Sequence, residues 1–145
     1  MDRLQDPGNI GTMIRTAEAA GYRGIIVIKG TCDVFSPKVV RAAAGSVLRM
    51  PFMMADGPDE AAGFLKSAGK KILGTRVENA RPFYDVDMSC DTALVIGNEG
   101  NGMSREFSML ADENIMIPMS GAIESLNAAV AAGIMMYNSL ERKVY

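Results

Sequence analysis

The side chains best suited to chemistry in this chain lie in three short polar stretches. Each stretch places amides, carboxylates, hydroxyls or an arginine among glycine, proline or apolar residues. Arginine can hold a phosphate through two parallel hydrogen bonds, and amides and carboxylates can orient a bound group. The candidates are Asn9 and Arg15 in residues 6–15, Glu99 in residues 95–102, and Ser125 and Asn127 in residues 117–127.

The second stretch reads Val-Ile-Gly-Asn-Glu-Gly-Asn-Gly and resembles a nucleotide-binding turn at first sight. Its glycines follow the order G-x-x-G-x-G, whereas the dinucleotide fingerprint is G-x-G-x-x-G. Glu99 lies in the middle, where a phosphate would be repelled. Three glycines exceed what a strand-to-helix turn requires, so they indicate close approach of the backbone to a ligand.

Composition removes several kinds of chemistry. The chain has no histidine, which excludes Ser-His-Asp and Cys-His catalysis and the commonest metal ligand, and we expect no metal. Its two cysteines, Cys32 and Cys90, form neither a C-x-x-C pair nor a disulfide framework. A net charge of −2 argues against a large basic surface for nucleic acid, although Lys38, Arg41 and Arg49 offer a modest basic stripe.

No apolar run approaches the roughly 20 residues that span a bilayer, and no signal sequence opens the chain. A cytoplasmic protein without membrane contact is therefore expected. The length of 145 residues fits one domain with a single core, and no internal boundary is visible. We expect residues 1–145 to form one domain.

Apolar periodicity and turn residues predict helices alternating with short buried strands. The predicted helices are Pro7 to Gly21 behind an Asp6 cap, Ser36-Pro37 to about Arg49, 58–68, 105–110 behind a Ser104 cap, and 126 to about 141 behind a Ser125 cap. The predicted strands are 24–28, 52–54, 71–75, 92–96 and 114–117, and residues 79–91 are predicted to form a loop.

This alternation predicts an α/β fold with a mostly parallel sheet and helices on both faces. In such folds ligands bind where strands end and helices begin, which is where the three polar stretches lie. The chain opens directly into a helix cap, with no strand before it. Because an α/β domain usually begins with a strand, we expect that the first strand is not included in this sequence.

Taken together, the three stretches resemble the signature motifs of the SpoU (TrmH-like) RNA ribose 2′-O-methyltransferases of the SPOUT superfamily. The three motifs occur in the family's order and together extend over nearly the whole chain. The motifs are Asp6-Pro7-Gly8-Asn9-Ile10-Gly11 with Arg15-Thr16-Ala17, then residues 95–102, then Ile117-Pro118-Met119 with Glu124-Ser125-Leu126-Asn127 and the alanine-rich segment that follows.

The resemblance implies an enzyme that uses S-adenosylmethionine to methylate a ribose 2′-hydroxyl in transfer or ribosomal RNA. It also implies a deep C-terminal trefoil knot, a homodimer with active sites across its interface, and relatives that often carry an N-terminal RNA-recognition domain. The catalytic residues that it implies are Arg15, Asn9, Glu99, Ser125 and Asn127. The residues implied to bind the methyl donor are Thr75, Gly97, Gly100, Ile117, Met119 and Leu126.

Arginine is effectively always protonated in proteins, so we expect Arg15 to hold the RNA phosphate and align the 2′-hydroxyl. Two alternatives to this enzyme remain open. One is a non-catalytic RNA-binding dimer of the same fold, against which the intact set of polar residues argues. The other is a nucleotide-dependent oxidoreductase, against which the order of the glycines argues.

Overall fold

The computed structural model describes residues 1–88, 91–123 and 125–144, and its strands are parallel wherever they pair. Cys90 and Glu124 lie outside the described residues. The strands form two groups, β1-β2 and β4-β6-β3-β5, which confirms the predicted parallel α/β class. They are β1 (Ile25–Ile28), β2 (Phe52–Ala55), β3 (Lys71–Thr75), β4 (Arg81–Pro82), β5 (Thr92–Val95) and β6 (Glu113–Met116).

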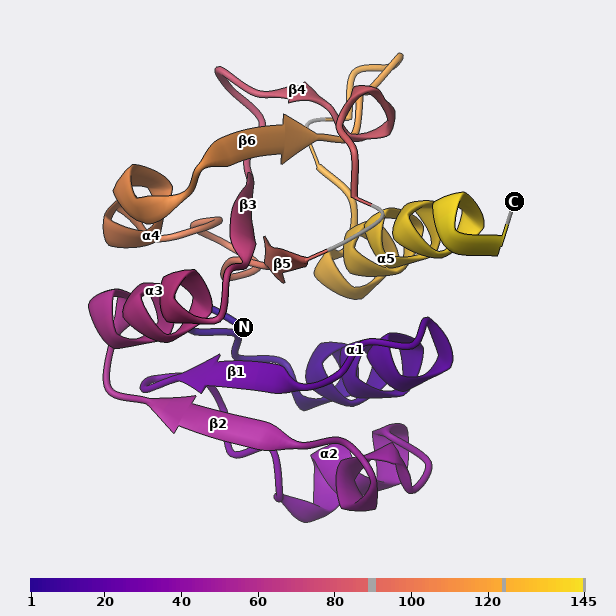
Figure 1. Cartoon of the computed structure of the whole chain (residues 1–145). Coiled ribbons are helices and arrows are strands. Elements are labelled where there is room, and N and C mark those ends of the chain that lie inside the picture. Colours follow the sequence, from indigo (N-terminus) through magenta and orange to yellow (C-terminus); the bar gives the residue numbers. More distant parts are fainter. Residues whose placement is uncertain (89–90, 124, 145) are drawn as a thin grey trace.

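The first residues of the chain join the two groups of strands. The Met1 amine donates to the Ile26 carbonyl at 2.8 Å, and the Met1 carbonyl accepts from the Ile28 amide at 3.1 Å. On the other side, the Asp2 amide donates to the Ile96 carbonyl at 2.9 Å, and Asp2 forms a parallel bridge with Gly97. Met1 and Asp2 therefore lie between β1 and β5, where Figure 1 shows the N-terminus.

Helices pack in two groups on opposite faces of the strands (Figure 1). One group packs against Val27 and the other against the neighbouring Ile28, whose side chain points to the other face. The first group is α1 (Pro7–Ala19), α2 (Pro37–Ala42) and α5 (Ala128–Val144), and the second is α3 (Pro58–Ser67) and α4 (Arg105–Leu110).

Close backbone contact positions α1 in the first group. A side chain at Gly11 would lie 2.4 Å from Ala42 Cβ, so only glycine lets α1 and α2 approach this closely. The start of α1 is fixed as predicted, since the Asp6 carboxylate accepts from the Asn9 amide at 2.7 Å and proline occupies the first turn.

Two predicted boundaries were wrong. The helix expected to continue to Arg49 ends at Ala42, because Ala44 and Gly45 adopt positive φ angles of 48° and 87°. A 3-10 turn, η1 (Ser46–Leu48), follows and brings Val47 into the core. The expected loop 79–91 also contains ordered structure, namely β4 beside β6 and a 3-10 turn, η2 (Phe83–Asp85).

The last helix also differs from its prediction. It begins at Ala128, and Asn127 caps it by accepting from the Ala129 and Val130 amides at 2.9 and 3.2 Å. Ser125, the predicted cap, lies two residues before this cap in an irregular segment. An asparagine directly before the helix satisfies the first free amides better than a serine two residues away.

Candidate active site at the carboxyl ends of the strands

The ends of three adjacent strands bring three of the predicted donor-binding residues to one edge of the sheet. Thr75 ends β3, Gly97 follows β5, and Ile117 follows β6, and β3 lies between the other two strands. The Thr75 hydroxyl donates to the Val95 carbonyl at 2.8 Å, which ties the end of β3 to the end of β5. This edge is where open parallel sheets bind ligands.

Glu99 lies at the centre of the polar loop that follows β5. Its carboxylate accepts from the Gln5 and Asp6 amides, each at 3.1 Å, and from the Asn9 side-chain amide at 3.3 Å. Burial acts to raise the pKa of Glu99, but these hydrogen bonds outweigh it and the pKa falls below its usual value. Glu99 is therefore an anionic anchor for the start of α1.

Asn9 and Asn127 continue this contact into the last helix. The Asn127 side-chain amide donates to the Asn9 side-chain carbonyl at 2.9 Å, while the Asn127 carbonyl oxygen caps α5. The three side chains form one hydrogen-bonded chain from Glu99 through Asn9 to Asn127, across 90 and 118 residues of sequence. The structure thus connects all three polar stretches.

Asn98 shapes the loop and was missed from the sequence. Its side-chain amide donates to the Arg3 carbonyl at 2.9 Å, and its side-chain oxygen accepts from the Gly100 and Asn101 amides at 3.0 and 3.1 Å. An asparagine that bonds its own backbone two residues on forms an Asx turn. The sequence signal for this turn was an asparagine two residues before a glycine, Asn98 and Gly100.

The loop itself explains one of the glycines. A Cβ at Gly97 would lie 2.1 Å from the Met103 nitrogen and 2.2 Å from the Gly102 carbonyl carbon, because the chain folds back on itself here. Gly102 has a positive φ of 68°. Gly100 is less confined, since a Cβ at that position would lie 3.6 Å from Asn98 Oδ1. Close approach of the loop to its own backbone therefore accounts for Gly97 without a ligand.

Asp2 is a second residue that the sequence did not single out. It is 1% exposed, and one carboxylate oxygen accepts from the Ser104 amide at 2.7 Å. Ser104 caps α4 as predicted, with its hydroxyl accepting from the Phe107 amide at 3.3 Å. Asp2 therefore fixes the segment that leads out of the glycine loop into α4.

Arg15 is not brought into the hydrogen-bonded chain. It lies exposed on α1, six residues beyond Asn9 and so about 9 Å further along the helix axis. Its guanidinium forms no ion pair or hydrogen bond with residues that the structure describes. The next residue, Thr16, faces α5, since a Cβ at Gly133 would lie 3.7 Å from Thr16 Cγ2.

The remaining predicted residues lie in the segment between β6 and α5. Met119 and Leu126 are each 37% exposed, while Ser125 is exposed and outside the chain of Glu99, Asn9 and Asn127. Apolar surface at the carboxyl ends of strands suits an aromatic or aliphatic group of a ligand. The segment after β6 thus offers two partly exposed apolar side chains.

The basic stripe on α2 is smaller than the sequence indicated. Arg49 forms a two-pronged ion pair with Glu18, which lowers the pKa of that carboxyl to about 2, first through the hydrogen bond to Arg49. Lys38 and Arg41 stay exposed on α2. Only these two cations of the stripe are available for an anionic partner.

Comparison with known proteins places this arrangement in a family. The model of the SpoU rRNA Methylase family matches residues 1–137. The chain is 42% identical over 141 residues to the 23S rRNA (guanosine(2553)-2′-O)-methyltransferase RlmP of Bacillus subtilis, covering 95% of this chain and 55% of that protein. It is 37% identical to the 23S rRNA (uridine(2479)-2′-O)-methyltransferase of Streptomyces viridochromogenes, and the match covers 99% of this chain and 52% of that protein.

Solved structures agree with this similarity. The SpoU methyltransferase AviRb of Streptomyces viridochromogenes in complex with AdoMet matches with a TM-score of 0.91 and 36% identity, over 99% of this chain and 58% of that one. The AdoMet-bound rRNA methyltransferase of Sinorhizobium meliloti matches with a TM-score of 0.92 and 37% identity, over 97% of this chain and 54% of that one. The chain spans a little over half the length of these relatives, and it belongs to the SpoU rRNA methylase family.

Proposed function

We propose that this chain is the catalytic domain of an RNA methyltransferase that transfers a methyl group from S-adenosylmethionine to a ribose 2′-hydroxyl in ribosomal or transfer RNA. The observation that carries the proposal is the hydrogen-bonded chain from Glu99 through Asn9 to Asn127, which joins all three family motifs. Relatives named as 2′-O-methyltransferases of 23S rRNA support the reaction class.

The residues at the strand ends fit the methyl donor. Thr75, Gly97 and Ile117 lie on neighbouring strand ends, and Met119 and Leu126, in the segment that follows β6, have partly exposed apolar side chains. We propose that these five residues, with Gly100, hold S-adenosylmethionine, which supplies an activated methyl group on a sulfonium. The segment after β6 would then belong to the C-terminal trefoil knot that the resemblance implies.

Arg15 has the role of positioning the RNA in this proposal. Its exposed guanidinium holds a phosphate beside the reacting ribose and stabilises negative charge that develops on the 2′-oxygen. A bond forms between that oxygen and the methyl carbon while the carbon–sulfur bond breaks. The hydroxyl proton passes to water or to a phosphate oxygen, because Arg15 remains protonated. Ser125 and Asn127 help to orient the nucleotide.

A homodimer would complete the site. Arg15 directly precedes Thr16, which faces Gly133 of α5, and α5 presents Val130, Ile134 and Tyr137 at helical spacing with 52%, 39% and 45% exposure. Such an apolar stripe on a surface helix is typical of an interface. Val130→Glu should therefore yield monomers in analytical ultracentrifugation, whereas Met109→Glu on the exposed side of α4 should not.

The decisive experiment is methyl transfer by the Arg15→Ala variant. We expect a loss of at least 100-fold in tritium transfer to unmodified ribosomal or transfer RNA, because phosphate alignment and charge stabilisation are both removed. Calorimetry should show unchanged binding of S-adenosylhomocysteine. Lys66→Ala, an exposed cation on α3, is the matched control. Turnover near that of the unmodified protein would contradict the role of Arg15.

Mapping the methylated nucleotide would then separate the two RNA classes. Transfer to neither class by a protein that binds S-adenosylhomocysteine would favour the non-catalytic RNA-binding dimer. The part of the chain that the structure describes has no helix long and apolar enough to cross a membrane.

A further inference from the structure

A polar cavity of about 430 Å³ lies beside the polar loop that follows β5. Its walls are the first residues of the chain, Gly30 just after β1, and residues 98 and 101–105 of the loop and the start of α4. Two arginines, Arg3 and Arg105, line it, whereas its described lining includes neither Arg15 nor Asn9. We call this cavity the loop pocket. It is distinct from the residues assigned above to the methyl donor and the ribose.

The backbone of Arg3 adopts a conformation that favours glycine. Its φ angle is 57°, in the left-handed region where a Cβ is strained. Hydrogen bonds hold it there: its amide donates to the Thr31 hydroxyl at 3.1 Å, and its carbonyl accepts from the side-chain amides of Asn98 and Gln5 at 2.9 and 3.0 Å. Strained residues persist where their surroundings hold them, and they cluster at functional sites. An arginine where glycine would fit the backbone better points to a use for its side chain.

The guanidinium of Arg3 has charged neighbours but no hydrogen-bond partner among the described residues. Its Nε lies 4.0 Å from Asp2 Oδ1, and its Nη2 lies 4.0 Å from Glu106 Oε1. Both distances exceed the reach of a hydrogen bond. The Arg3 side chain is 45% exposed, so the N–H groups of its guanidinium are available to a ligand.

The charges around the loop pocket favour an anion. Arg105 is exposed at the start of α4 and forms no ion pair with a residue that the structure describes. The formal charges of Asp2 and Glu106 balance those of the two arginines, but Asp2 is 1% exposed and already accepts from the Ser104 amide. A ligand that enters the pocket therefore meets two guanidiniums and one exposed carboxylate. Arginine binds phosphate oxygens through two parallel hydrogen bonds.

We propose that the loop pocket holds a phosphate of the RNA backbone beside the nucleotide being methylated, with Arg3 as the residue that positions it. This inference rests on the proposed function. Consecutive residues of one loop connect the two places, since Asn98 bonds to Arg3 and Glu99 bonds to Asn9. Arg15 and Arg3 then hold the RNA chain at two points. A phosphate contact fixes the register of the RNA and carries no sequence information.

The test is RNA binding by Arg3→Gly, measured by fluorescence anisotropy with a short mixed-sequence single-stranded RNA. The natural target sequence is not needed, because the contact is with the backbone. We expect about fivefold weaker binding and a loss of about 0.7 from the slope of log affinity against log salt concentration. The urea midpoint should equal or exceed that of the parent chain, because glycine adopts the positive φ without strain. An arginine with a purely structural role would lower the midpoint when removed.

Glu106→Gln provides the opposite change. The Glu106 carboxylate competes with the phosphate for Arg3, so removing its charge should tighten RNA binding about threefold. Asp59→Asn on α3 changes the net charge equally at an exposed site outside the loop pocket, and it should have a smaller effect. Arg3→Lys keeps the charge but loses the planar fork, so its affinity should lie between those of the parent chain and Arg3→Gly.

Four results would overturn the loop pocket. They are an absence of RNA binding by the parent chain, an unchanged affinity and salt slope in Arg3→Gly, a loss of affinity matched by a lower urea midpoint, and equal gains from Glu106→Gln and Asp59→Asn. Weaker binding of S-adenosylhomocysteine by Arg3→Gly would assign Arg3 to the donor and also count against the pocket. The methyl-transfer assay decides the proposed reaction separately, since transfer can fail in a chain that binds RNA through Arg3.

Discussion

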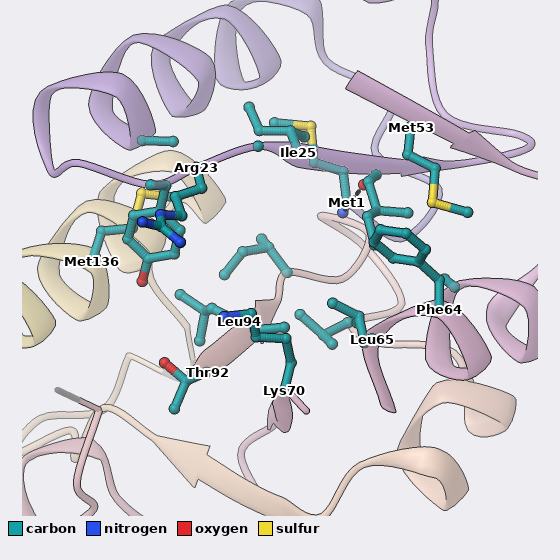
Figure 2. A pocket seen from close by; sticks show the side chains of 18 of the residues that line it. Met1, Arg23, Ile25, Met53, Phe64, Leu65, Lys70, Thr92, Leu94 and Met136 are labelled. Carbon is teal, nitrogen blue, oxygen red and sulfur yellow. Dashed lines mark hydrogen bonds between the residues drawn. The ribbon is translucent and has the colours of Figure 1, made fainter. Parts of the chain in front are cut away.

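The polar loop around Glu99 and an apolar cavity of about 810 Å³ between β1 and β5, which we call the slot (Figure 2), lie on either side of Met1 and Asp2, yet they are built in opposite ways. In the loop, the carboxylate of Glu99 and the side chains of Asn98, Asn9 and Asn127 are all hydrogen-bonded within the chain. In the slot, backbone groups of two strands face an apolar space. The loop therefore holds its shape through its own hydrogen bonds, whereas the slot leaves backbone groups of two strands next to apolar side chains.

A side chain added inside the loop should lower the free energy of unfolding more than any other change proposed for either region. In Gly97→Ala the new methyl group would meet the Met103 backbone at 2.1 Å, and neither strand β5 nor α4 can move freely. We expect a loss of about 3 kcal/mol or more in the free energy of unfolding, measured by urea denaturation.

Gly63 on α3 provides the control for this loss. A Cβ at Gly63 would meet nothing within 4 Å, so Gly63→Ala should stabilise the protein by about 0.5–1 kcal/mol through helix propensity. A Gly97→Ala variant as stable as the parent chain would show that the loop is not close-packed, and the contrast with the slot would be lost.

The Met1 amine tests the slot side of the comparison. Burial lowers the pKa of this amine from 8.0 to about 6, and the nearby Asp2 carboxylate only partly offsets that effect. Between these values the unfolded chain binds a proton that the folded chain does not. In a chain that begins at Met1, the free energy of unfolding should therefore fall by about 2 kcal/mol as the pH drops from about 8 to 6.

Acetylation of the amine is the matched comparison, since it removes the titrating group while leaving an N–H to bond to Ile26. Denaturation at pH 6 and pH 8.5 should show a smaller pH dependence for the acetylated chain. An identical dependence in both forms would mean that the amine is solvated and that the slot does not bury charge.

Asn127 gives the smallest expected effect and separates two roles within the loop region. Asn127→Ala removes the cap of α5 and should cost about 1 kcal/mol. Asn127→Asp keeps an oxygen for the cap, so its stability should stay within about 0.5 kcal/mol of the parent, but it loses the donor to Asn9. Denaturation midpoints compare the two; equal losses would show that the bond to Asn9, and not the cap, stabilises the helix.

Most of the fold was predictable from local sequence. Lys71–Thr75 and Thr92–Val95 form strands as predicted, and Asp6-Pro7 and Ser104 start helices as expected, because these signals act within a few residues. The end of α2 was not predictable. Ala44 takes a positive φ that alanine rarely adopts, and only the packing of the following turn into the core requires it.

The site was predictable as a set of residues but not as a set of contacts. The three motifs placed Asn9, Glu99 and Asn127 together, and the structure joins them by hydrogen bonds. Asp2 was missed, since a carboxylate that binds an amide 102 residues away leaves no local pattern. The reason for Gly97 was also missed, because the close return of the loop at Met103 is a tertiary contact.

The bonds that tie the first nine residues to positions 96–127 have a consequence for the order in which the protein folds. Synthesis delivers these N-terminal residues first, but their partners Ile96, Glu99, Ser104 and Asn127 leave the ribosome 93 to 118 residues later. Contacts of such large sequence separation are slow to form. The segment from Met1 to Asn9 therefore docks late, and until then the edges of β1 and β5 that it covers stay open to aggregation.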